Sequence, residues 1–157
     1  MTSMLKLYDV ERLDQPKYLN TKCGGLDFQP KVGWKNVPTN AKSIALVLHD
    51  PDAPVSGGWI HWLIFNIPIT ASNIPGSSDD KHFILPEGSI VAKNSYGNYR
   101  YNGACPPPGK LHHYNLHLFA LDTELPMSLK NQPLLLYKEI QKHTIVSDTI
   151  TSTYQTK

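Results

Sequence analysis

The stretch SIALVLHDPDAPVSGGWIHWLIFNIP, residues 43–68, decides the fold, because it joins two apolar runs through a stiff acidic loop. The first run, Ser43 to Leu48, is almost continuously apolar and too short for a helix, which predicts a strand buried on both faces. A proline follows Asp50 and another follows Ala53, and the residue before a proline is held in extended geometry. The carboxylates of Asp50 and Asp52 are therefore placed at a strand end by a rigid backbone.

The second apolar run begins at Trp59, directly after a glycine-rich turn. Side chains of a strand alternate between its faces, so a regular strand here has one face made of Trp59, His61, Leu63, Phe65 and Ile67. His61 is the one titratable group in that row. It is a candidate for a site at the same end of the sheet as the two carboxylates.

A third stretch, YNGACPPPGKLHHYNLHLFALD (residues 101–122), supplies further polar groups. Its Pro-Pro-Pro-Gly loop fits neither a helix nor a central strand. In the run that follows, alternation puts His112 and Tyr114 on one face and His113 on the other. If the start of this strand meets the end of the first, the site combines two carboxylates, two imidazoles and a phenol beside a proline loop.

Length and composition indicate one globular domain, residues 1–157, that is mostly β. Forty per cent of the 157 residues are hydrophobic, and 13 prolines and 10 glycines separate strand-like runs. A net charge of +2 without any basic run makes nucleic acid a poor default partner. No apolar segment is long enough to span a bilayer, so we expect no integral membrane segment.

The N-terminal stretch and the cysteines bear on the compartment. Charges interrupt the first 15 residues, which therefore lack the apolar core of a secretion signal, and we expect a cytoplasmic protein. Cys23 and Cys105 lie far apart and form no CxxC pair. In the cytoplasm, two reduced thiols are the expectation. Cys105 is next to the predicted site and is a candidate for oxidation.

Local patterns predict the remaining elements. A helix is expected within residues 128–143, with Pro133 in its first turn and Leu134, Tyr137 and Ile140 at helical spacing. Strands are expected at residues 4–10 and 145–155. The proline-dense acidic loop also suggests that Ala53–Pro54, or a neighbouring X-Pro bond, is cis.

Three ordered motifs resemble the phosphatidylethanolamine-binding protein family, which includes the Raf kinase inhibitor proteins. They are DPDAP at residues 50–54, GWIHW at residues 58–62, and PPPG at residues 106–109 leading into HHY at residues 112–114. Motifs near both ends are similar to the short bacterial and archaeal branch. The family usually has His-Arg-Tyr where this chain has His112-His113-Tyr114, so a permanent cation is replaced, on the outward face of the strand.

The resemblance implies a fold of two antiparallel β-sheets with Greek-key topology and one or two short peripheral helices. It also implies a small pocket for phosphate-like anions and phospholipid head groups, and small relatives of this branch are often homodimers. The candidate ligand-binding residues are Asp50, Asp52, His61, Pro108, Gly109, His112 and Tyr114. A carboxylate that holds a histidine ring would favour its charged form, so that the anion meets imidazolium rather than bare carboxylate.

Other functions remain open at this stage. The resemblance permits a regulator that inhibits a protein kinase or protease through protein contacts. A metal enzyme is less favoured, because His49, His113 and His117 are in no metal-binding motif and packed or surface positions explain them better. Ser56 and Cys105 lack the sequence context of catalytic nucleophiles. We therefore expect a binding protein that is not an enzyme and needs neither metal nor cofactor.

Overall fold

The structure is a computed structural model that describes residues 4–79 and 81–157. Residues 1–3, which begin the stretch used for the leader prediction, and Asp80 lie outside the described residues. The strands are β1 (Lys6–Tyr8), β2 (Val32–Lys35), β3 (Ser43–Asp50), β4 (Trp59–Ile67), β5 (Asn73–Ile74), β6 (Ile90–Val91), β7 (His112–Leu121) and β8 (Thr144–Tyr154). The helix is α1 (Pro133–Lys142), with 3-10 turns at Pro16–Tyr18, Thr21–Cys23 and Met127–Asn131.

The larger sheet has five antiparallel strands in the order β6-β4-β3-β7-β8. Within this sheet, β4 pairs with β3 and β6 pairs with β4, and β7 then returns to pair with the free side of β3. This is the Greek-key order, so the predicted topology is confirmed. The central strand is β3, the first apolar run of the sequence, and it packs against both layers, as predicted for a strand buried on both faces.

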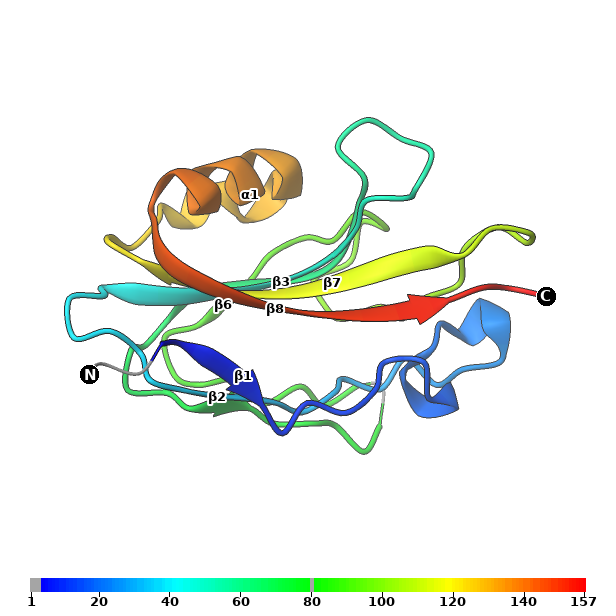
Figure 1. Ribbon diagram of the computed structural model, residues 1–157, viewed down its shortest axis with the longest axis horizontal. Coiled ribbons are helices and arrows are strands. Elements are labelled where there is room, and N and C mark those ends of the chain that lie inside the picture. Colours follow the sequence, from blue (N-terminus) through cyan, green and yellow to red (C-terminus); the bar gives the residue numbers. More distant parts are fainter. Residues whose placement is uncertain (1–3, 80) are drawn as a thin grey trace.

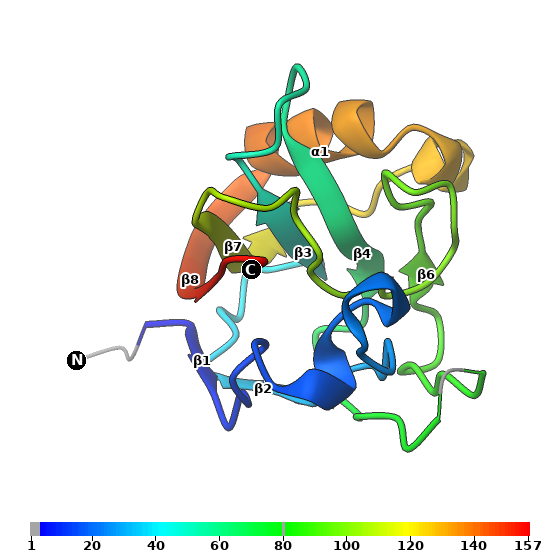
Figure 2. The same cartoon turned by 90° about the vertical axis from the view of Figure 1, so that its right-hand side faces the viewer.

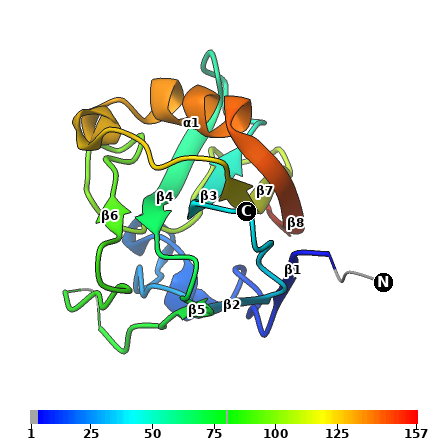
Figure 3. The ribbon, with the colours of Figure 1, turned by 90° about the vertical axis from the view of Figure 1, so that its left-hand side faces the viewer.

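The smaller sheet has the order β1-β2-β5 and lies under one face of the larger sheet (Figures 1 and 3). The space between the two sheets holds the main hydrophobic core, to which Trp34, Ile44, Leu46, Trp62 and Leu116 belong. Two antiparallel sheets around one core are the predicted architecture. The chain is mostly β, with one short helix and 3-10 turns.

Helix α1 covers the opposite face of the larger sheet (Figure 1). It begins at Pro133, which occupies the first turn as predicted, because proline lacks the N–H that would be unbonded there. Its buried side chains are Leu136 and Ile140, whereas Leu134 is 38% exposed. Of the three residues at helical spacing, Ile140 is buried, Tyr137 is half-buried and Leu134 is exposed. The side of α1 that packs on the sheet is therefore centred on Leu136 and Ile140.

Strand β4 departs from regular alternation at two places. Leu48 pairs with Trp62 and His49 with Ile60, so His61 is an extra residue opposite the β3 ladder. A second register shift lies near Asn66, whose φ is 53°. The single row from Trp59 to Ile67 predicted from strict alternation is therefore wrong. His61 and Trp62 instead both contact tyrosines on the side of the smaller sheet.

Candidate functional site

The end of β3 and the start of β7 meet, which is the condition under which the polar groups named from the sequence form one site. The two strands are antiparallel, with His49 opposite Asn115 and Ser43 opposite Leu121. Asp50 is thereby placed beside His112 and Tyr114. The β3–β4 loop, the loop that enters β7 and the C-terminus lie at this same end of the sheet, at the right of Figure 1 and facing the viewer in Figure 2.

A cavity of about 270 Å³ opens at this end of the sheet. Four of the seven predicted residues line it: Asp50, His61, His112 and Tyr114. The remaining lining residues are Ala53, Pro54, Val55, Trp59, Tyr96, Cys105, Pro106 and Pro107. The volume is near the lower end of ligand pockets, roughly 300–1,000 Å³, and suits a small head group rather than a whole lipid.

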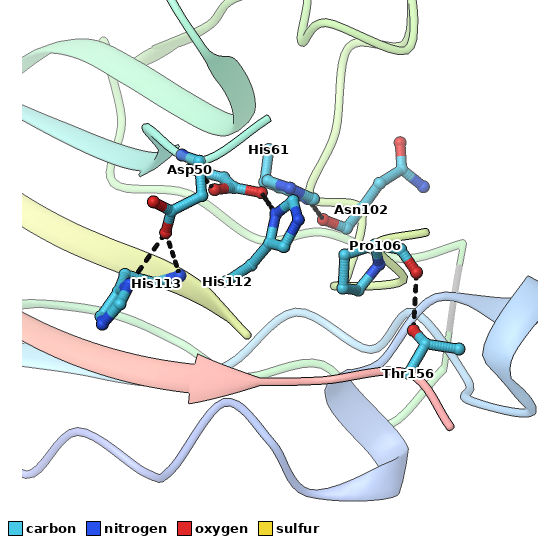
Figure 4. A network of polar contacts seen from close by, with 8 residues as sticks. Asp50, His61, Asn102, Pro106, His112, His113 and Thr156 are labelled. Carbon is cyan, nitrogen blue, oxygen red and sulfur yellow. Dashed lines mark hydrogen bonds and ion pairs between the residues drawn. The ribbon is translucent and has the colours of Figure 1, made fainter. Parts of the chain in front are cut away.

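Asp50 and His112 form a buried pair in the wall of this cavity (Figure 4). The His112 Nδ1 donates to Asp50 Oδ2 at 2.6 Å, and each side chain is only 4% exposed. The other carboxylate oxygen, Oδ1, accepts the backbone N–H of Asp52. Because Nδ1 is committed to the carboxylate, the ring keeps Nε2 for a ligand, and this nitrogen has no partner among the described residues.

His61 is buried and is bonded to a backbone carbonyl rather than to a carboxylate (Figure 4). Its Nδ1 donates to the carbonyl oxygen of Asn102 at 2.9 Å, while its own carbonyl accepts the N–H of Asn102. Burial lowers the pKa of His61 to about 4, against smaller opposing effects of the Asn102 carbonyl and Asp50. The neutral ring with its hydrogen on Nδ1 presents Nε2 as an acceptor.

Tyr114 supplies a hydroxyl to the same cavity. Burial raises the pKa of this phenol well above its ordinary value, and the nearby Asp50 charge adds to the rise. The hydroxyl keeps its hydrogen at every physiological pH and makes no hydrogen bond to a described residue. The ring packs edge-on against His61, with centroids 5.2 Å apart. Tyr114 is thus a fixed donor without an internal partner.

The comparisons with known proteins agree with this arrangement. The profile described as "Phosphatidylethanolamine-binding protein" matches residues 9–155. The chain belongs to the phosphatidylethanolamine-binding protein family. It is 36% identical to UPF0098 protein YbcL of Escherichia coli over 140 residues, covering 86% of this chain and 75% of YbcL. It is 44% identical to a UPF0098 protein of Methanothermobacter thermautotrophicus over 105 residues, covering 67% and 68% of the two chains.

Solved structures of phosphatidylethanolamine-binding proteins show the same fold. The crystal structure of Escherichia coli YbcL, described as a new member of the mammalian PEBP family, has a TM-score of 0.83 at 30% identity and covers 100% of both chains. A homologue from Chlamydia trachomatis, CT736, has a TM-score of 0.73 at 26% identity and covers 98% of this chain and 99% of its own. The chain therefore fits the bacterial and archaeal UPF0098 branch of the family.

His113 faces outward, as the alternation of β7 predicts. Asp52 accepts the His113 backbone N–H at 2.7 Å and its ring Nδ1 at 2.8 Å. These contacts with His113 hold the pKa of the Asp52 carboxyl below its ordinary value. Asp52 is therefore turned away from the cavity, and its observed part is to join the acidic loop to β7. Of the two aspartates only Asp50 lines the cavity, and a part of Asp52 in ligand binding stays a prediction.

The proline loop lines the cavity with other residues than predicted. Pro106 and Pro107 form part of the wall, whereas Pro108 and Gly109 lie exposed in the turn beyond it. The Thr156 hydroxyl donates to the Pro106 carbonyl at 2.7 Å, which ties the loop to the C-terminal end (Figure 4). The sequence could not show which of the consecutive prolines faces inward, because identical neighbouring residues carry no local signal that distinguishes them.

The expectation of two reduced cysteines is wrong in this structure. Cys23 and Cys105 form a disulfide across 82 residues of sequence, with their Cα atoms 5.6 Å apart. The bond joins the 3-10 turn at Thr21–Cys23 to the wall of the cavity. Disulfides are typical of oxidising compartments, so the reduced state expected from a cytoplasmic location does not describe this chain. The cytoplasmic location itself stays a prediction.

The acidic loop and the loop at residues 94–102 complete the cavity. No described peptide bond is cis, so the predicted cis proline at Ala53–Pro54 is wrong. A hydrogen bond from Val55 N to Ala53 O closes a tight turn about a trans Pro54. Gly58 has a φ of 74°, and a Cβ there would meet Asp50 O at 2.6 Å. Tyr96 packs edge-on against Trp59, at a ring distance of 5.2 Å.

The other histidines have local partners. His49 Nε2 contacts Gly57 O at 2.8 Å, and His117 Nδ1 contacts Thr149 Oγ1 at 2.7 Å. Among the described residues, no group of three or more histidine, cysteine or acidic side chains is placed to hold a metal ion. None of the described helices is long and apolar enough to cross a membrane.

Proposed function

We propose that this protein binds phosphate-type anions and phosphorylated head groups in the cavity at the end of β3 and β7. The observation that carries the proposal is the buried Asp50–His112 pair, whose outer nitrogen faces a cavity of about 270 Å³. Asp50 fixes the ring and compensates a positive charge on it, so an anion beside Nε2 meets an imidazolium rather than the carboxylate.

Each polar group of the cavity then has one task. His112 Nε2, when protonated, and the Tyr114 hydroxyl donate to phosphate oxygens. Neutral His61 does the opposite, because its Nε2 accepts a hydrogen, such as the P–OH of a monoester or an ammonium group of the ligand. A ligand that offers both acceptors and a hydrogen, as phosphoethanolamine does, matches the whole set.

The proposed role is binding without a chemical step. Of the two nucleophiles considered from the sequence, Cys105 has its sulfur in a disulfide and Ser56 does not line the cavity. The family also includes the Raf kinase inhibitor proteins, so a second proposal is that this protein inhibits a kinase or protease through protein contacts. A third proposal is that it forms a homodimer, as the small relatives of this branch suggest. Capture of the same protein by wild type and by Asp50→Ala with His61→Ala would favour protein contacts that need no cavity.

The test is to titrate the wild-type protein with phosphate, phosphoethanolamine and a short-chain phospholipid. The ring signals of the histidines, observed by NMR, report binding. We expect saturable shifts of the His61 and His112 signals in the wild type, and loss of the His61 shift in His112→Gln. If His112→Gln binds phosphate as tightly as the wild type does, recognition through this ring is wrong.

A further inference from the structure

The larger sheet ends in one long edge strand. Its two edges are β6, with 2 residues, and β8, with 11 residues. An edge strand presents a row of unpaired backbone N–H and C=O groups, and proteins protect such edges by keeping them short or by placing proline and lysine there. Strand β6 is protected by its shortness. Strand β8 contains neither proline nor lysine, and its one charged residue is Asp148.

Strand β8 is open to solvent along its whole length. None of its residues is buried and every second one is exposed, whereas β7 beside it is mostly buried. Figures 2 and 3 show β8 at the outer side of the sheet, with β1 beneath it. The Asp148 carboxylate does not guard the edge, because its Oδ2 accepts the backbone N–H of Leu7 at 2.8 Å and is held toward β1.

A hollow of about 200 Å³ runs along this edge. It is lined by Thr151, Ser152 and Thr153, with Arg12 and Asp14 on its other side. Consecutive residues of a strand point to opposite faces, so a hollow that touches all three lies along the edge of the strand. The backbone of β8 can therefore be reached by a strand from outside.

The regular part of β8 has a centre. The register shift against β7 falls between Thr144 and Val146, so residues 146–154 form an uninterrupted strand with Ile150 in the middle. When two copies of this stretch pair antiparallel about Ile150, the residues directly opposite one another are Val146 and Tyr154, Ser147 and Thr153, Asp148 and Ser152, Thr149 and Thr151, and Ile150 with itself.

This register matches the two strands in character. Aliphatic residues meet aliphatic or aromatic ones, and polar residues meet polar ones, which are the cross-strand pairs that stabilise a sheet. A register centred on Asp148 would set two carboxylates opposite each other, and one centred on Thr149 would set Asp148 against Ile150. Centring on Ile150 avoids both conflicts.

Arg12 adds a match of charge. It lines the hollow together with Ser152, and its side chain is 82% exposed. In the register centred on Ile150, Asp148 of a second copy lies opposite Ser152 and therefore near Arg12. Two-fold symmetry repeats this contact, and the net charge of +2 per chain opposes association only weakly.

We propose that β8 pairs edge to edge with β8 of a second copy of this chain, antiparallel and centred on Ile150, so that the two larger sheets form one continuous sheet. This inference rests on the homodimer proposed above, for which it supplies the interface. It does not depend on the anion cavity.

The experiment measures the dissociation constant of the dimer by sedimentation equilibrium. Ser147 and Thr153 carry the test, because both are exposed and lie about 20 Å apart within one chain but directly opposite each other in the proposed dimer. The variants Ser147→Glu/Thr153→Glu and Ser147→Lys/Thr153→Lys each set like charges against each other twice. We expect each to raise the dissociation constant about tenfold.

The matched control is Ser147→Lys/Thr153→Glu, which changes the same positions but sets opposite charges against each other and should dimerise at least as well as the wild type. Mixing the Glu/Glu variant with the Lys/Lys variant should also restore dimers. A dimer that both like-charge variants leave intact would overturn this interface and keep the homodimer. A wild type that is monomeric at millimolar concentration would overturn both. Phosphate titration of the same samples reports the proposed anion binding separately.

Discussion

Two aspartate–histidine pairs join the acidic loop to the start of β7 in this protein and lie on opposite faces of that strand. Asp50 with His112 and Asp52 with His113 join the same two segments, at 2.6 Å and 2.8 Å. Both side chains of the first pair are 4% exposed, whereas those of His113 and Asp52 are 48% and 25% exposed. Strand alternation alone sends one pair into the cavity and the other to the surface.

An aspartate–histidine pair is expected to contribute differently to stability when it is buried and when it is exposed. An exposed ion pair contributes about 0–1 kcal/mol, because water and salt screen it. A buried partner that loses its counter-charge has no water to replace it, and breaking such a pair costs about 3–5 kcal/mol. We therefore expect the buried pair of Asp50 and His112, called the inner pair, to matter for both stability and the proposed binding. The exposed pair of Asp52 and His113, called the outer pair, joins the acidic loop to β7.

The largest expected effect follows from breaking the inner pair. Asp50→Asn leaves His112 buried without its carboxylate, and we expect a loss of about 3–5 kcal/mol in the free energy of unfolding. Urea denaturation measures it. The variant should also lose phosphate binding at temperatures where it is still folded. A loss no greater than that of Asp52→Asn would contradict the distinction between the two pairs.

Reduction of the disulfide should affect the inner pair and spare the outer one. Cys105 is part of the cavity wall, and the bond closes a long loop across 82 residues. We expect reduction, or Cys23→Ser/Cys105→Ser, to lower the free energy of unfolding by up to about 4 kcal/mol. Ring NMR signals should move more for His112 than for His113. Equal movement of both signals would show that the wall does not depend on this bond.

His61 adds a third case to the two pairs, because it is a buried imidazole that has a carbonyl and not a carboxylate as its partner. Its pKa is about 4 in the folded protein and near 6.5 in an unfolded chain, so the unfolded state takes up a proton first as pH falls. The stability that neutral His61 contributes is complete above about pH 6.5 and is lost toward pH 4, by up to roughly 3 kcal/mol.

The measurement is the free energy of unfolding of wild type and His61→Gln at several pH values across this window. We expect the wild type to lose more stability than the variant as the solution is acidified. Parallel curves would mean that His61 is not the buried neutral group. The difference between the two curves removes the contribution of other titrating groups.

The smallest effect is expected for the outer pair. Asp52→Asn should lower the free energy of unfolding by less than about 1 kcal/mol, and less again at high salt. It should leave phosphate affinity near that of the wild type, since Asp52 does not line the cavity. A binding loss as large as that of Asp50→Asn would show that Asp52 acts on the ligand after all.

The sequence was sufficient to identify the strands whose ends meet, although it left their meeting as a condition. Continuous apolar character identified β3, and alternation placed His112 and Tyr114 on one face and His113 on the other. Alternation failed at His61, which is an extra residue opposite β3 and is bonded to the distant Asn102. Strict alternation cannot detect such an extra residue, so it named a residue that lines the cavity but gave it the wrong neighbours.

The remaining errors also arise from tertiary contacts. The disulfide needs Cys23 and Cys105 to meet, which no local pattern shows across 82 residues. Pro106 lies in the cavity wall and its carbonyl accepts a hydrogen bond from Thr156, near the end of the chain, a contact that no local pattern shows. The helical spacing noted for the helix linked Leu134 to Ile140, whereas packing against the sheet buries Leu136 together with Ile140. Residues that respond to a partner far along the chain were the ones that sequence patterns missed.

The central claim is that the buried pair, not the exposed one, recognises phosphate. It is tested most directly by titrating phosphoethanolamine into His112→Gln and His113→Gln under identical conditions and measuring affinity by calorimetry. We predict that His112→Gln loses binding at least about tenfold, as expected for removal of one charge-assisted hydrogen bond, while His113→Gln binds as the wild type does. Equal affinities of the two variants, or a greater loss in His113→Gln, would contradict this account.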